Sequence, residues 1–122
     1  MIWKVTCYIA AAVLADVGVV LLVTPVTQIA FLGAPLDAGA AVMGTRSAPL
    51  FLAMALVFVL FAPLEASTLR RRFAAIAAFF WSLIVATGTW HFLQGAVSGD
   101  VFGAVVVEGV LALVFLAQIR SR

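Results

Sequence analysis

Long uncharged stretches, interrupted by only a few short polar breaks, constrain this chain more than any other feature. The basic residues gather at alternate breaks, namely Lys4, then Arg70, Arg71 and Arg72, then Arg120 and Arg122. The intervening breaks carry acids instead, Asp37 and Asp100. Because Lys and Arg concentrate in the cytoplasmic loops of membrane proteins, this alternation predicts four membrane crossings with both termini in the cytoplasm.

The composition agrees with a membrane location. Hydrophobic residues make up 66% of the chain and charged residues 10%, whereas soluble domains are roughly half apolar and a quarter charged. The net charge is only +2, and six of the seven basic residues lie at the predicted cytoplasmic edge, where they would meet anionic lipid head groups. We therefore expect a multi-pass protein of the bacterial inner membrane, in contact with lipids and without a nucleic-acid partner.

The predicted fold class is all-α, a four-helix transmembrane bundle that forms a single membrane domain over residues 1–122. The predicted spans are residues 2–23, 40–62, 73–96 and 101–118, and each approaches the ~20 residues that a crossing needs. Thr24-Pro25 should end the first span, followed by an amphipathic extension over 26–32 near the interface. Strands are not expected, because an open sheet would leave backbone groups without hydrogen bonds in lipid.

Four ionisable residues fall inside these spans: Asp16, Arg46, His91 and Glu108. Counted at 1.5 Å per residue from the basic end of each helix, Asp16 and Glu108 lie about 18 Å up, Arg46 about 25 Å and His91 about 28 Å. We predict that Glu108 pairs with Arg46, either as a structural bridge between two helices or as part of a working site. Asp16 is then the candidate for proton exchange.

The remaining candidate residues have simpler interpretations. Trp90 and His91 are placed near the outer interface, where amphipathic rings commonly lie, although His91 could also be one axial ligand of a haem or a chlorophyll-type pigment. Arg70, Arg71 and Arg72 are expected in a cytoplasmic loop that contacts lipid head groups or a partner. The single cysteine, Cys7, excludes an internal disulfide and a multi-cysteine metal site, and no metal site is predicted.

Several short motifs resemble those of the small four-helix DoxX-like membrane proteins, many of which are uncharacterised. They are the run L-V-T-P from Leu22, then Leu32-Gly33, Gly44-Thr45-Arg46, Leu69-Arg70-Arg71 and Glu108. The resemblance touches about 100 residues and depends mainly on Pro25, Gly33, Arg46 and Glu108. It implies a four-helix bundle with an accessory or redox-linked role, and it does not imply a particular reaction.

A second resemblance concerns the first span alone. The segment Ala12-Val13-Leu14-Ala15-Asp16-Val17 is similar to the first-helix signature of the small multidrug-resistance transporters, which carry a glutamate where this chain has Asp16. The rest of the chain departs from that family, because Arg46 lies in the second span and the first outer loop is longer. The similarity implies proton-coupled export through Asp16.

Neither a G-x-S-x-G nucleophile motif nor a glycine-rich phosphate loop is present, so the motifs do not predict an enzyme. The leading hypothesis is a non-enzymatic accessory or structural subunit that packs against other membrane-protein subunits in a larger complex. Two alternatives stay open. One is a small proton-coupled transporter that uses Asp16, and the other is a binder of a quinone, carotenoid, pigment or haem that uses His91 and the aromatic residues. No cofactor is required by the sequence.

Overall fold

The computed structural model describes residues 1–120, and within this range all of the regular secondary structure is helical. Its elements are α1 (Ile2–Val23), α2 (Pro25–Phe31), α3 (Ala38–Phe61), α4 (Thr68–Leu93) and α5 (Val101–Arg120). All but the short α2 are long and apolar enough to cross a membrane. The prediction of an all-helical fold with four helices able to cross a membrane is therefore confirmed.

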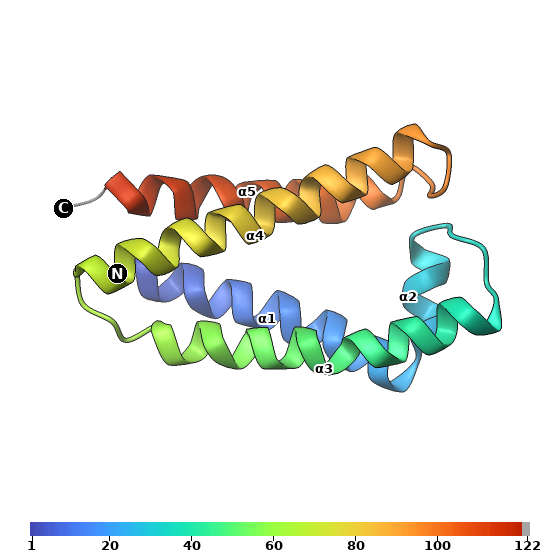
Figure 1. Cartoon of the computed structure of the whole chain (residues 1–122), viewed down its shortest axis with the longest axis horizontal. Coiled ribbons are helices and arrows are strands. Elements are labelled where there is room, and N and C mark those ends of the chain that lie inside the picture. Colours follow the sequence, from blue (N-terminus) through green and yellow to red (C-terminus); the bar gives the residue numbers. More distant parts are fainter. Residues whose placement is uncertain (121–122) are drawn as a thin grey trace.

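The four long helices are arranged as two pairs. Helix α1 packs along α3, and α4 packs along α5 (Figure 1). The pairs lie close together at the end that carries Lys4, the start of α4 and the end of α5, which we call the basic end. They diverge toward the opposite end, the α2 end, where α2 lies against α1 and α3. The space between the two helix pairs therefore widens from the basic end to the α2 end.

Aromatic side chains fill this space in the basic half of the bundle. Phe58 of α3 is fully buried, and its ring centroid lies 5.3 Å from that of Phe73 on α4 and 5.4 Å from that of Phe115 on α5. Trp3 of α1 makes edge contacts with Phe73 and Phe115 and donates a hydrogen bond of 3.1 Å from Nε1 to the carbonyl oxygen of Phe61. Helices from both pairs thus meet in one aromatic cluster.

At the α2 end the two pairs are joined through their loops. The backbone N–H of Ser98 donates a 2.9 Å hydrogen bond to the carbonyl oxygen of Leu32, which follows α2. The next residue, Gly33, has φ +68°, and a Cβ added there would lie 2.6 Å from the Cβ of Ser98. Glycine suits this position because it tolerates positive φ and allows the second loop to approach the backbone closely.

The observed helix bounds confirm some predictions and correct others. The first helix ends at Val23 as expected, and Pro25 begins α2. Helix α3 starts at Ala38, two residues before the predicted 40–62 span, because the Asp37 side chain accepts a hydrogen bond from the N–H of Ala40. The largest difference is in α4, which covers Thr68–Leu93 and not 73–96.

The arginine triplet is therefore helical and does not lie in a loop. Ser67 accepts a hydrogen bond of 3.2 Å from the N–H of Arg70 and caps α4, which begins at Thr68, five residues before the predicted start. At its other end α4 stops at Leu93, and Gly95, with φ +70°, begins the turn into α5. Helix α5 continues to Arg120, two residues beyond the predicted span. Arg122 lies outside the described residues.

Candidate functional site

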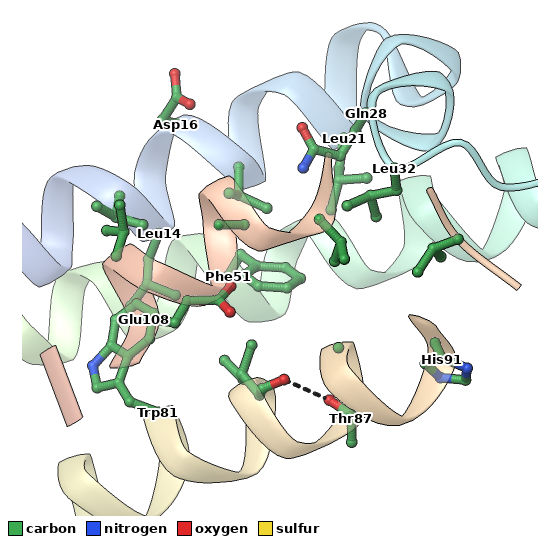
Figure 2. A pocket seen from close by; sticks show the side chains of 18 of the residues that line it. Leu14, Asp16, Leu21, Gln28, Leu32, Phe51, Trp81, Thr87, His91 and Glu108 are labelled. Atoms are coloured by element: carbon green, nitrogen blue, oxygen red, sulfur yellow. Dashed lines mark hydrogen bonds between the residues drawn. The ribbon is translucent and has the colours of Figure 1, made fainter. Parts of the chain in front are cut away.

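A cavity of about 780 Å³ occupies the space where the two helix pairs diverge (Figure 2). All five helices contribute to its wall, and most of the lining side chains are apolar. At its inner limit lie Leu14 of α1, Phe51 of α3 and Trp81 of α4, and Gln28 and Ile29 of α2 line it at the α2 end. Its volume falls within the ~300–1,000 Å³ range of sites that bind small molecules.

Glu108 places a carboxyl group inside this apolar cavity. It lies seven residues, or two helical turns, before the fully buried Phe115, so the two side chains share the inward face of α5. Figure 2 shows its carboxylate directed into the space bordered by Phe51, Trp81 and Leu14. Glu108 is half-buried, and the structure gives its side chain no hydrogen bond or ion pair within residues 1–120. The cavity therefore contains an acid that the chain itself does not neutralise.

Asp16 occupies the edge of the same cavity, not its interior. It precedes Gly18 by two residues, which is about 200° around α1, and Gly18 faces α3. Asp16 is exposed, and Figure 2 shows its carboxylate directed away from the cavity. The cavity wall also includes exposed residues of α1, α4 and α5, namely Ala12, Thr87, His91 and Val107, so the cavity reaches the surface of the bundle.

The structure does not bring Arg46 to Glu108. Arg46 follows Gly44 by two residues, again about 200° around the helix, and Gly44 faces Leu21 and Pro25. It is therefore on the outer face of α3, where it is exposed, and it is not among the residues that line the cavity. No ion pair joins it to Glu108 in the described part of the chain. The predicted bridge between the second and fourth spans is absent from this structure.

His91 and Trp90 are neighbours in the sequence but face different surroundings. His91 is exposed and lines the cavity near the α2 end (Figure 2). Trp90 lies about 180° from Trp81 around α4, is 59% exposed and faces outward. Thr87, one turn before His91, also lines the cavity, but its hydroxyl donates a 2.9 Å hydrogen bond to the carbonyl oxygen of Ile84. The polar side chains of the wall are therefore few and well separated.

The three arginines of α4 do not form one equivalent group. Arg70 is half-buried, donates a 3.1 Å hydrogen bond to Oε1 of Gln118, and lies with its guanidinium carbon 4.9 Å from the ring centroid of Trp3. Arg71 and Arg72 are exposed. Arg70 therefore connects α4 to both α5 and α1 within the bundle, which leaves only its two neighbours as candidates for head-group or partner contacts.

The sequence offered the aromatic residues as a possible lining of a site for a lipophile, but it did not identify Phe51 and Trp81 as the ones that line the cavity. Phe51 precedes Phe58 by seven residues, so the spacing already places both on one face of α3, and the same spacing relates Phe115 to Glu108. Trp81 is 1% exposed, and its Nε1 has no acceptor in the described residues. In Figure 2 this nitrogen lies on the edge of the indole turned away from Glu108.

No group of three or more His, Cys, Asp or Glu side chains within residues 1–120 is arranged to hold a metal ion.

Comparison of the chain with protein-family models, with curated proteins and with solved structures found no match. The resemblances to DoxX-like proteins and to small multidrug-resistance transporters therefore stay predictions. The geometry of the cavity is what supports a function.

Proposed function

We propose that this chain is a membrane protein that binds one lipophilic small molecule in the cavity between its two helix pairs. The observation that carries the proposal is the placement of Glu108, a single carboxyl group on the inward face of α5, within a cavity of about 780 Å³ whose wall is otherwise largely apolar. Sites for small molecules combine an apolar wall with a few polar groups that fix the orientation of the ligand. Packing alone gives no reason for a carboxyl group there, because an unpaired charge in a membrane interior costs several kcal/mol.

Access from the bilayer supports the same proposal. The cavity reaches the surface of the bundle at exposed residues of its wall, among them Ala12 and Val107. A lipophilic molecule dissolved in the membrane could enter by this route without crossing water. This function develops the cofactor-binding alternative from the sequence, with Glu108 in the central position and His91 at the edge.

The test is to identify what the protein carries. The chain is extracted from its native membrane in a mild detergent, its absorption spectrum is recorded, and bound molecules are released into organic solvent for mass spectrometry. Ala104→Trp places a large side chain in the cavity wall and should deplete the specific ligand at least tenfold. Leu113→Trp adds the same side chain on the exposed face of α5 and serves as the control. Equal amounts of every extracted molecule in the two variants would contradict the proposal.

A second candidate function is the accessory subunit, and the position of Arg46 favours it. Arg46 projects from the outer face of α3 within a span, and it has no ion pair in the described chain. A charged residue at that depth is expected to meet an acidic residue of another subunit or to reach a lipid head group. Mild-detergent extraction should then yield a particle far heavier than 12.9 kDa, and Arg46→Ala should reduce its mass. A particle of unchanged mass in the variant would argue against this role for Arg46.

We also propose a bacterial inner-membrane location with the basic end in the cytoplasm, supported by the basic residues at that end and the acids Asp37 and Asp100 at the other. Single cysteines introduced as Glu65→Cys and Gly99→Cys, each in a Cys7→Ser background, test the orientation. A membrane-impermeant thiol reagent added to intact cells should label Gly99→Cys alone. Labelling of Glu65→Cys alone would reverse the orientation.

A further inference from the structure

The ionisable lining of the cavity is acidic. Asp16 and Glu108 supply two carboxyl groups, His91 is the remaining ionisable residue of the wall, and no Lys or Arg lines it. The basic side chains lie elsewhere in the described chain, at the basic end or, for Arg46, on the outer face of α3. A carboxylate in apolar surroundings is stabilised by an opposite charge, and residues 1–120 place none beside Glu108. The group that complements Glu108 must therefore come from the ligand or be a proton.

Aromatic rings border the same part of the cavity. Phe51 of α3 and Trp81 of α4 line it together with Glu108, and Figure 2 shows the carboxylate directed into the space between the helices that carry them. The faces of aromatic rings attract cations, by about 0.5–2 kcal/mol and most strongly where water is excluded, and tryptophan is the best of them. A carboxylate combined with aromatic rings is thus a favourable site for an organic cation whose charge is spread over apolar groups.

We propose that the ligand is a lipophilic organic cation, with its positive charge held beside Glu108 and its apolar groups against Phe51, Trp81 and the aliphatic wall. This inference deepens the proposed function and rests on it. Asp16 has a related role at the edge of the cavity, where its exposed carboxylate adds negative potential. An anionic lipophile of the same size would meet two carboxylates and no compensating cation.

The charge of the ligand can be tested with two probes that share size and shape. Tetraphenylphosphonium is a cation, and tetraphenylborate is its anionic counterpart. Equilibrium dialysis of the full chain in a neutral detergent, with protein-free micelles as the blank, measures the affinity for each. We expect the cation to bind at least tenfold more tightly than the anion. A tenfold difference requires ~1.4 kcal/mol, and the attraction between the cation and the Glu108 carboxylate in a site without water is larger than this.

Variants of Glu108 connect this preference to the site. Glu108→Gln should weaken binding of the cation at least tenfold and leave binding of the anion unchanged or stronger, whereas Glu108→Asp, which keeps the charge, should retain most of the affinity. Glu65→Gln is the matched control, because Glu65 is an exposed acid of the connection between α3 and α4, outside the cavity. Circular dichroism of each variant verifies that it is folded.

The outcomes separate the two proposals. If both probes bind with similar affinity and Ala104→Trp abolishes both, the cavity binds lipophiles but the preference for a cation is wrong. Cation binding that is equally strong in Glu108→Gln also overturns the inference. If neither probe binds above the micelle blank, and Ala104→Trp depletes nothing from the native extract, the proposed function itself fails.

Discussion

The contacts of Arg70 lead to a sharp prediction about the stability of the bundle. Its guanidinium donates a 3.1 Å hydrogen bond to Gln118 of α5 and lies over the ring of Trp3 of α1, so one side chain connects three helices. A hydrogen bond from a charged group contributes about 1.5–3 kcal/mol, and a cation–π contact near the surface about 0.5–1 kcal/mol. Because Arg70 is only half-buried, we take the lower part of this range and expect Arg70→Ala to lower the free energy of unfolding by about 2 kcal/mol.

Arg72 provides the control for this measurement. It lies nine residues before Trp81, on the opposite face of α4, and it is exposed, so Arg72→Ala should change the free energy of unfolding by less than about 0.5 kcal/mol. Arg70→Lys should fall between the two variants, because lysine keeps the charge but loses the planar donor group. Reversible unfolding by SDS in mixed micelles, followed by circular dichroism, measures all three. Equal small losses for Arg70→Ala and Arg72→Ala would refute the reasoning.

Three further predictions concern the core, the outer loops and the cavity. Phe58→Ala should lower the free energy of unfolding by about 3 kcal/mol, because this ring is fully buried, and Leu60→Ala, at an exposed site, by less than about 1 kcal/mol. A similar loss for both would show that the aromatic cluster is not the core. Gly33→Ala should lower the free energy of unfolding more than Gly95→Ala. Both glycines have positive φ, which strains an alanine by about 1–2 kcal/mol, but only at Gly33 does the new Cβ meet another loop. Thermal unfolding measures the difference, and equal midpoints would contradict the loop contact. Ala104→Leu should fill part of the cavity, raise the free energy of unfolding by about 1 kcal/mol and weaken ligand binding, and a loss of stability would show that the wall has no free space.

The sequence determined the helical architecture because its strongest signals are local. Apolar runs of about 20 residues indicate spans, and the Thr24-Pro25 break locates the end of α1 at Val23 as observed. The predicted start of α4 is wrong because a run of charged residues does not by itself indicate a loop. The signal that decides the start is Ser67, a residue type that commonly caps helices.

The candidate site was harder to predict from the sequence than the helices, because the depth of a residue in the membrane does not give the direction of its side chain. Arg46 and Glu108 were predicted to pair because both lie in the half of the bundle away from the basic end. Helical periodicity separates them. Glu108 lies two turns before the buried Phe115 and shares its inward face of α5, whereas Arg46 lies opposite Gly44 on the outer face of α3. The path of α2 over the open end could not be predicted in the same way, because it depends on tertiary contacts with α1 and α3.

The position of the cavity follows from the size of the side chains that face the space between the helix pairs. From the basic end to Trp81 they include large rings, and the buried ring of Phe58 contacts both Phe73 and Trp81. Beyond Trp81 the facing residues include Ala104, which is too small to fill a space that is held open where α2 lies against the first helix pair. A larger apolar residue at position 104 would extend the core at no cost in polarity, so the small side chain of Ala104 helps to keep this space open.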